Sequence, residues 1–350
     1  MIDGCPAGIP FDLELVRRDL SRRRPGQALT TARSEADEPV VLSGVFEGVT
    51  TGAPIAIVVA NTDQRSGDYD ALRDLFRPSH ADYTYSAKYG TRDHRGGGRS
   101  SARETLARVI GGAVARMILA HVSSIDVVAA VTRLGDIVSD VEPEVMSSER
   151  VYASPVRCDD PTAERLMIER LEKLREEGDS IGGVVSVGVS GMPVGLGEPI
   201  YGKLNATLAA AMMSINGALG FEMGIGFHGA ESRGSENNDQ WIEGEEGLRT
   251  ASNNSGGVQG GISNGMPLLF RVAFKPPSSI ALTQSHGTKE GGTIEHAIDG
   301  RHDPSIVIRA VPVVEAMTLL VLADRWIAAG MGREKGRKGE REKRGEQSSR

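Results

Sequence analysis

The chain is 350 residues long, which allows two ordinary domains or one large one with a substantial core. With 39% hydrophobic and 25% charged residues it is neither fibrous nor wholly disordered, and its formal net charge is −7. Two cysteines, Cys5 and Cys158, provide neither a disulfide framework nor metal-ligand spacing, which predicts a cytoplasmic protein without a metal centre. No run of 18 apolar residues occurs, so no membrane span is expected.

The first predicted elements are two β-rich runs within residues 39–60, joined around Thr50–Gly52 like a hairpin. Residues 61–99 then show no convincing periodicity, although short helical turns could lie within them. Irregular segments of this length are usually functional. This one carries His80 and His94, together with tyrosines and arginines.

A helix follows, because Ser101 and Glu104 have capping-box spacing and apolar residues then recur at helical intervals up to Ile118. The next helix is predicted from Pro161 to Gly178, since proline suits a first helical turn and glycine a helix end. The remaining predicted elements are strands at 125–131, 184–189 and 268–276, a helix at 204–216, a Gly/Asn/Ser loop at 253–264 and a final helix starting near Pro312.

Strands and helices do not alternate strictly along the chain. This order predicts a mixed α/β or α+β protein with antiparallel sheets and argues against a doubly wound nucleotide-binding sheet. We interpret residues 1–330 as a single domain and 331–350 as a charged, disordered tail. Residues 333–350 carry eight basic and four acidic side chains, so binding of nucleic acid through the tail is a remote alternative.

Glycines 96–98 and Arg99, Ser100 and Ser101 directly precede the capped helix. A helix N-terminus attracts anions, glycines let the backbone approach a ligand closely, and arginine adds a charge-assisted bond. A flexible connector with an ordinary cap explains the same residues equally well. Neither a Walker motif nor a G-x-G-x-x-G fingerprint is present.

Several polar groups indicate an enzyme that acts on an anion. Arginine, histidine and aspartate occur together at 77–82 and again at 301–303, and histidine can transfer protons near neutral pH. The arginine run 22–24 is either a solvated surface or an anion clamp. Residues 275–279, Lys-Pro-Pro-Ser-Ser, could be a simple turn. These residues do not identify the ligand.

A series of motifs in fixed order carries a resemblance to a known family. The motifs are RRRPG (22–26), SGVFEGVTTGAPI (43–55), NTDQRSGDY (61–69), RPSHADYTY (77–85), GGGRSSARET (96–105), GDSIGG (178–183), GLGEP (195–199), MSINGALGFE (213–222), GGISNGMP (260–267), KPPSS (275–279) and GRHDP followed by IRAVPVVEAM (300–317). In these motifs the chain resembles chorismate synthase over nearly its whole length up to the tail.

The resemblance implies a β-α-β sandwich with long loops, assembled as a homotetramer. It implies a lyase that converts 5-enolpyruvylshikimate 3-phosphate to chorismate and phosphate by anti-1,4-elimination. Reduced FMN is required although no net oxidation occurs, and NADPH is a possible reductant. The expected partners are this small substrate and other copies of the chain, without nucleic acid or membrane.

Residue roles also follow from the resemblance alone. His80 resembles the histidine that protonates the departing phosphate, and Asp303 the carboxylate that helps to deprotonate the flavin. The expected flavin-binding residues are Arg99, Ser100, Ser101, Asn216, Gly217, Gly260, Lys275, Pro276, Pro277, Ser278, Ser279 and Arg301. Arg23, Arg77, Arg103 and Arg309 are expected to bind the anionic substrate or NADP.

One family motif is missing. The family begins with a strand that ends in a T-x-G-E-S-H-G-like motif, whose histidine protonates the reduced flavin, whereas this chain starts at Met1-Ile2-Asp3-Gly4. We therefore expect a longer natural protein, and low turnover from the chain as written. His286, in Ser285-His286-Gly287, is a superficial echo in a region without a family match. The alternative is a truncated pseudo-enzyme that binds flavin without turnover.

Overall fold

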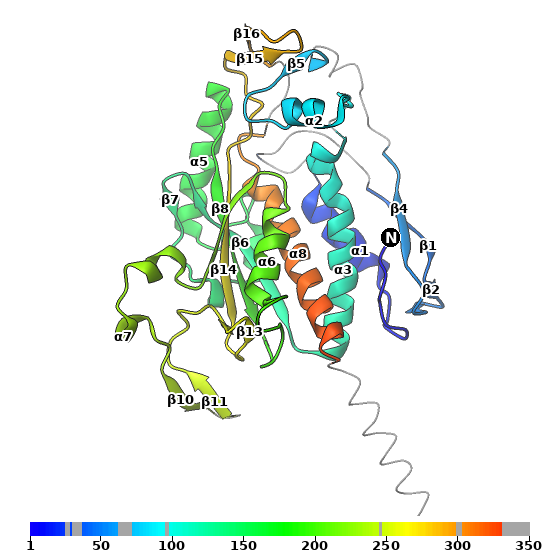
Figure 1. Ribbon diagram of the computed structural model, residues 1–350, viewed down its shortest axis with the longest axis vertical. Coiled ribbons are helices and arrows are strands. Elements are labelled where there is room, and N and C mark those ends of the chain that lie inside the picture. The colour runs from blue at the N-terminus through cyan, green and yellow to red at the C-terminus, as the bar shows by residue number, and fades with distance from the viewer. Residues whose placement is uncertain are drawn as a thin grey trace, which may run out of the picture.

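Three layers make up the body of the protein: a five-stranded sheet, a layer of helices, and small hairpins on the far side of the helices (Figure 1). The computed structural model describes residues 1–24, 29, 37–61, 72–94, 98–244, 247–298 and 303–330. The predicted tail 331–350 and the predicted flavin contact Arg301 therefore lie outside the described residues.

The large sheet has the strand order β7-β6-β8-β14-β9. Its strands are β6 (Asp126–Leu134), β7 (Ile137–Val138), β8 (Gly183–Ser190), β9 (Ala218–Met223) and β14 (Leu268–Phe274). All four strand pairings in this sheet are antiparallel, as the sequence predicted. The central strands are buried along most of their length, because helices cover one face and further chain segments the other.

The helical layer consists of α1 (Leu13–Arg23), α3 (Thr105–Val122), α6 (Leu204–Met213) and α8 (Val307–Ala328). Helix α3 is long and apolar enough to cross a membrane by length and composition, but most of it is buried inside the protein. It packs against α8 and α1, so its apolar character is that of a core helix.

Helices α3 and α8 approach each other most closely at Gly112. A Cβ atom built on Gly112 would lie 2.4 Å from Cβ and 2.5 Å from Cα of Ala316, which leaves no room for a side chain. Small residues at such a crossing let the two helix backbones come together and exclude water.

We expect Gly112→Ala to lower the free energy of unfolding by about 1–3 kcal/mol, because the added methyl group meets backbone atoms of α8. Chemical denaturation measures this change. Gly234→Ala is the matched control, since nothing lies within 4 Å of a Cβ at that position. Equal stability of the Gly112 variant and the parent protein would show that the crossing is looser than described.

The third layer is formed by β1 (Pro39–Ser43) paired with β4 (Ala56–Val59), and by β2 (Val45–Phe46) paired with β3 (Val49–Thr50). The predicted hairpin-like unit is thus confirmed in outline. Its tight turn lies at Glu47 and Gly48, both with positive φ, and not around Thr50–Gly52. The extra bend arises because Gly44, also at positive φ, breaks the first run into two strands.

A separate lobe lies at the upper end of the molecule in Figure 1. It contains β5 (Leu75–Phe76), α2 (Asp82–Tyr89), β15 (Gln284–Thr288) and β16 (Thr293–His296). Strand β15 is central, with β16 on one side and β5 on the other. Part of the predicted irregular segment 61–99 is thus regular structure, although residues 62–71 and 95–97 lie outside the described residues.

The outer elements complete the chain. They are α4 (Ser148–Ala153), α5 (Pro161–Glu177), α7 (Gly234–Asn237), β10 (Trp241–Gly244), β11 (Gly247–Thr250), β12 (Val258–Gln259), β13 (Ile262–Ser263) and 3-10 turns at 98–100, 102–104, 143–145 and 226–230. Helix α5 confirms the predicted boundaries, with Pro161 in its first turn and Gly178 at φ 71° as its C-cap.

Two helix predictions need correction. Helix α8 begins at Val307, so Pro312 lies inside it and not at its start. Val307 and Ile308 are buried, and the free energy gained by burying them in the first helical turn outweighs the cost of an internal proline. The Ser101 hydroxyl does accept a hydrogen bond from Arg103 N, but Glu104 pairs with Arg108, so the reciprocal capping box is not formed.

Candidate active site

Three charged side chains meet where β5 leads into α2. Asp82 is the first residue of α2, and its carboxylate is buried. Arg77 donates from Nε to Asp82 Oδ2 at 2.8 Å, and its backbone N–H also points at Oδ2 at 3.2 Å. His80 Nδ1 lies 2.8 Å from Asp82 Oδ1. One carboxylate therefore orients both the arginine and the histidine.

The Asp82 carboxylate remains ionised in this cluster. Burial alone would raise the pKa of Asp82, but hydrogen bonds from His80 and Arg77 outweigh it and hold the pKa well below its ordinary value. Arg92 adds a further ion pair to Oδ1 at 2.5 Å. The site thus combines one buried negative charge with two guanidinium groups.

The backbone before His80 is in an uncommon conformation. Ser79 has φ 54°, a left-handed value that costs a residue other than glycine about 1–3 kcal/mol and is frequent at functional sites. Arg77 Nη2 lies 3.0 Å from the His80 ring nitrogens. A neutral ring with its proton on Nδ1 satisfies both neighbours, because Nδ1–H donates to Asp82 while Nε2 accepts from Arg77.

The segment 275–279 leaves the end of β14 and lies against this cluster. Lys275 Nζ donates to the backbone oxygen of Ser79. Arg77 Nη1 donates to Ser279 Oγ at 3.1 Å, and Ser180 Oγ donates to the backbone oxygen of Pro277 at 2.8 Å. Residues predicted to bind flavin are thereby placed beside the predicted catalytic His80.

A second predicted flavin group, Asn216 and Gly217, adjoins the same segment. Lys275 N donates to Gly217 O at 2.9 Å, and Asn216 Nδ2 donates to Ser100 O at 3.4 Å. The Asn216 Oδ1 atom is buried and has no hydrogen-bond partner. Ser100 and Ser101 therefore lie near this group as predicted, while the side chain of Arg99 is outside the described residues.

Asp303 and Arg309, at the start of α8, form an ion pair of 3.0 Å. The preceding loop is anchored because Ile181 N donates to Pro304 O at 2.8 Å. Ile306 lies close to Gly217, so this pair adjoins the Asn216 turn. The structure thus brings the predicted carboxylate and one predicted substrate arginine into direct contact.

The predicted ligand residues Arg23 and Arg103 share a partner that sequence reasoning missed. Arg23 is almost fully buried and donates to Asp37 Oδ2 at 3.0 Å, while Arg103 Nη1 lies 3.4 Å from Asp37 Oδ1. In the same arginine run, Arg22 stacks on the Tyr152 ring, with its guanidinium carbon 3.6 Å from the ring centre. Arg22 and Arg23 are thus held by neighbouring side chains, whereas Arg24 is exposed.

Gly260 is the predicted flavin residue that the structure separates from the others. It lies in the β12–β13 turn, where Leu204 N donates to Gly261 O at the N-terminal end of α6. Asn216 follows the opposite end of this ten-residue helix, which is about 15 Å long. Within one chain, Gly260 and the Asn216 group are thus at different ends of α6.

Sequence reasoning grouped Asp82 with Arg77 and His80 but did not include it among the expected site residues, and it did not consider Arg92. Arg92, ten residues further along the chain, carried no signal that linked it to this group. Asp37 was also missed, because its pairing with Arg23 depends on how α1 and α3 pack.

Comparison with known proteins gives this geometry a family. The model of the family "Chorismate synthase" matches residues 1–327. The chain belongs to the chorismate synthase family. It is 52% identical over 336 residues to the chorismate synthase of Porphyromonas gingivalis, covering 95% of this chain and 91% of that protein. It is 50% identical over 332 residues to that of Methanosarcina mazei, covering 94% and 91%.

A solved structure titled "Crystal Structure of Chorismate Synthase" is also similar. It shares 30% identity and a TM-score of 0.72, covering 93% of this chain and 86% of that one. The predicted family, the α+β fold class and the assignment as a lyase of the chorismate synthase type are confirmed. The roles of individual residues remain predictions, and they form part of the proposal that follows.

Proposed function

We propose that this chorismate synthase acts at the cluster of Arg77, His80 and Asp82. In the net 1,4-elimination, the ring proton leaves, the C–H electron pair becomes a new double bond, and the existing ring double bond shifts to the carbon that bears the phosphate. The C–O bond to phosphate breaks with its electron pair on oxygen. The substrate is 5-enolpyruvylshikimate 3-phosphate, and the products are chorismate and phosphate.

The single observation that supports this assignment most strongly is the convergence of four distant segments. Residues 77–82, 100–101, 216–217 and 275–279 are linked by direct hydrogen bonds. A site that must hold both a cofactor and an anionic substrate needs such a meeting of cations, hydroxyls and free backbone groups.

The residues present fit reduced FMN. Asn216 Oδ1 is buried without a partner and needs an N–H or O–H donor, which the ring and ribityl groups of a flavin offer. Ser100, Ser101, Ser278 and Ser279 are hydroxyl donors, and Lys275 and Arg99 are cations suited to its phosphate. When bound, reduced FMN lends an electron to the substrate and recovers it, so no net oxidation occurs.

We assign proton transfer at two positions. We assign to His80 the donor role: its ring, protonated on both nitrogens when the phosphate group is bound, gives the Nε2 proton to the departing oxygen, so that the product is hydrogen phosphate. The ring then returns to the neutral Nδ1–H form that Asp82 orients. Asp303 would accept the proton that the bound cofactor gives up, and its ion pair with Arg309 fixes the position of its carboxylate. General acid or base groups of this kind contribute about 10²- to 10⁴-fold to a rate.

The arginines supply charge for a substrate with two carboxylates and a phosphate. Arg77 lies beside His80 and suits the phosphate, while Arg103, whose backbone N–H donates to Ser101 Oγ, and Arg309, paired with Asp303, suit the carboxylates. Arg23 is held by Asp37. We propose that its positive charge helps the neighbouring charged residues of this cluster to bind an anionic ligand such as NADPH.

The experiment for this function is an anaerobic assay with the purified 350-residue protein, photoreduced FMN and the phosphorylated substrate. Chorismate absorbance and released phosphate should appear in equal amounts and only with reduced FMN. FMN binding without phosphate release would favour the pseudo-enzyme instead.

Arg99→Ala tests the flavin assignment. We expect FMN to bind roughly 10- to 150-fold more weakly, because a charge-assisted hydrogen bond contributes about 1.5–3 kcal/mol. Fluorescence titration of FMN measures this change. Arg165→Ala is the matched control, since Arg165 is exposed on α5 and forms a surface ion pair with Glu169. Unchanged affinity in the Arg99 variant would remove this residue from the site.

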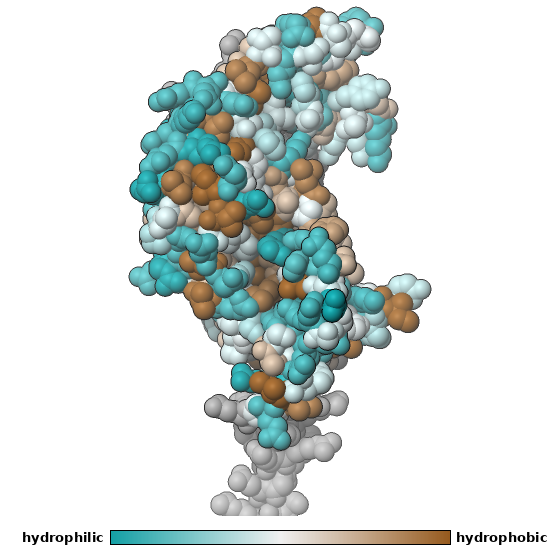
Figure 2. All heavy atoms as spheres, turned by 90° about the vertical axis from the view of Figure 1, so that its left-hand side faces the viewer, coloured by the Kyte–Doolittle hydropathy of each residue, from teal (hydrophilic) through white to brown (hydrophobic). Residues whose placement is uncertain are grey.

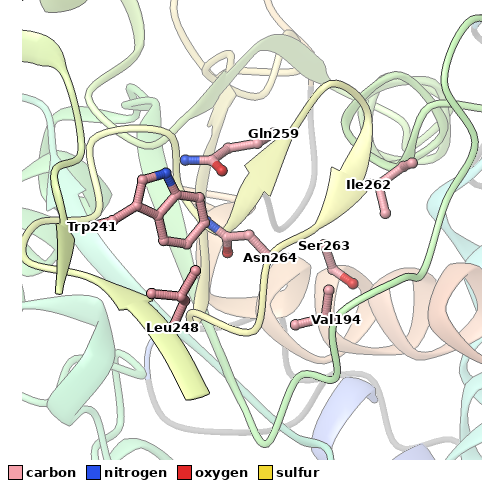
Figure 3. A pocket seen from close by; sticks show the side chains of 7 residues that line it. All are labelled: Val194, Trp241, Leu248, Gln259, Ile262, Ser263 and Asn264. Carbon is pink, nitrogen blue, oxygen red and sulfur yellow. The ribbon is translucent and has the colours of Figure 1, made fainter. Parts of the chain in front are cut away.

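A homotetramer would explain the position of Gly260, because this residue could then contribute to the flavin site of another copy. A hollow of about 490 Å³ lies next to it, with Trp241 and Leu248 on one side and Ile262 and Val194 on the other (Figure 3). Exposed apolar side chains of this kind mark interaction surfaces. Light scattering of the purified protein measures the assembly.

We propose that the protein assembles with other copies of itself in the cytoplasm. Figure 2 shows brown hydrophobic patches set among teal polar side chains on one face, including its lower part, where α7, β10 and β11 lie. We propose that these patches contact other copies of the chain, and that neither nucleic acid nor a membrane is a partner.

A further inference from the structure

Strand β15 carries buried polar atoms that have no partner. His286 has no exposed surface, and neither of its ring nitrogens has a hydrogen-bond partner of good geometry, although the His296 backbone is near enough to interact with the ring. The Oε1 atom of Gln284, two residues earlier, is likewise buried and has no partner. Buried polar atoms without well-formed hydrogen bonds are uncommon, so their occurrence together requires an explanation.

The register of the small sheet places these groups beside the proposed active site. Thr288 pairs with Leu75 and Gly287 with Phe76 in antiparallel β15 and β5. Continuing this register sets His286 alongside Arg77. Because side chains alternate along a strand, Gln284, His286 and Thr288 share one face of β15. The unpaired atoms therefore lie on the face that carries Arg77.

The opposite neighbour adds a second histidine. On β16, His296 pairs with Gln284, and its ring stands edge-on to that of His286 with 5.4 Å between the centres. Burial lowers the pKa of His286 most, and the His296 ring and Arg77 lower it further, whereas the His296 backbone and Glu295 raise it. His80 and Asp82 are the further titratable groups beside Arg77. An unliganded His286 is therefore neutral at neutral pH, in a positively charged setting.

The chemistry of the group selects an anion and not a metal. Among the described residues, no cluster of three or more His, Cys, Asp or Glu side chains could hold a metal ion. Arg77 and Lys275 bring positive charge to the region. Hydrogen phosphate suits the unpaired atoms, because its oxygens accept from an imidazole N–H while its O–H donates to Gln284 Oε1.

We propose that His286, with Gln284 and with His296 beside it, forms a phosphate subsite that receives the phosphate as it leaves Arg77 and His80. The inference rests on the proposed function only in taking phosphate release to occur at those two residues. The side chains of Arg77 and His80 keep 14% and 21% of their surface exposed, so a small anion can reach this side of the sheet from solvent.

The hairpin that carries His286 is attached to β5 by only a short ladder. Beyond the Leu75 and Phe76 pairings, Lys289 N donates to Asp74 O at 3.1 Å, and the exposed Lys289–Asp74 ion pair at 2.7 Å adds little energy. Entry of phosphate between β15 and Arg77 thus requires a small shift of the hairpin, without unfolding of the body.

The test uses inorganic phosphate as the probe and the full-length protein. Isothermal titration at neutral pH measures its dissociation constant for the parent protein, His286→Asn and His286→Gln. We expect roughly 10- to 100-fold weaker binding in at least one variant, because a charge-assisted hydrogen bond is lost. The asparagine amide can replace Nδ1 and the glutamine amide Nε2, so rescue by one variant identifies the ring nitrogen that makes the contact.

His228→Asn is the matched control, because His228 is exposed on the 226–230 turn. A second readout is the His286 imidazole signal in NMR spectra, which should shift with phosphate but not with chloride at equal ionic strength. If both His286 variants keep the circular dichroism spectrum of the parent protein and bind phosphate with unchanged affinity, the subsite is overturned. A buried water would then be the hydrogen-bond partner of the His286 ring. That result would contradict the subsite and leave the proposed function standing. Phosphate binding by a parent protein that shows no turnover would instead contradict the proposed function and leave the subsite standing.

Discussion

His80→Ala is expected to lower kcat by about 10²- to 10⁴-fold while FMN affinity changes little. The alanine removes the ring that donates a proton to the leaving oxygen, but it removes no proposed flavin contact. Anaerobic phosphate-release kinetics give kcat, and flavin titration gives the affinity.

His228→Ala serves as the control for this change, because His228 is an exposed histidine that lies beside Glu231 at the surface. Its kcat should equal that of the parent protein. Equal losses of kcat and FMN affinity in His80→Ala would contradict a proton-transfer role and indicate collapse of the site.

Asp82→Asn is expected to cost about 3–5 kcal/mol in the free energy of unfolding, because Arg77 and Arg92 lose the buried carboxylate that they share. Turnover should fall as well, since His80 loses the group that orients it. Asp136→Asn is the control: Asp136 pairs with Arg170 at the surface, where an ion pair contributes about 0–1 kcal/mol. Urea denaturation compares the two variants.

The stability difference between the parent protein and Asp82→Asn should depend on pH. The pKa of Asp82 is held well below its ordinary value of 3.8, so its stabilising effect is complete above that value. Between the ordinary and the lowered pKa, the unfolded state takes up a proton that the folded state does not. The difference should therefore shrink as the pH falls below about 4, and a difference that grew there would contradict the assignment.

Local signals predicted much of the fold. Helix α5 was predicted at both ends because Pro161 and Gly178 act through their own backbone geometry. The start of α8 was placed too late, because Val307 and Ile308 are helical through burial against the rest of the protein. Helix α2 escaped prediction because Asp82 is its one buried residue, so it shows no apolar periodicity.

The motifs in the sequence predicted which residues belong to the site, but not which of them are in contact. Spacing suggested that His80 and Arg77 act together, and the structure joins them through Asp82. No local signal places Lys275 against Ser79, because that contact spans almost 200 positions and depends on the strand order of the sheet. His286 was set aside as an echo of a motif, and only its burial beside Arg77 gives it a proposed role.

The most direct test of the account is a crystal structure of the full-length protein with FMN and the phosphorylated substrate. We predict the substrate phosphate within hydrogen-bond distance of both His80 and Arg77, with the flavin against Asn216 and residues 275–279. A phosphate bound elsewhere, with His80 and Arg77 still closed on Asp82 alone, would contradict the assignment of this cluster as the active site.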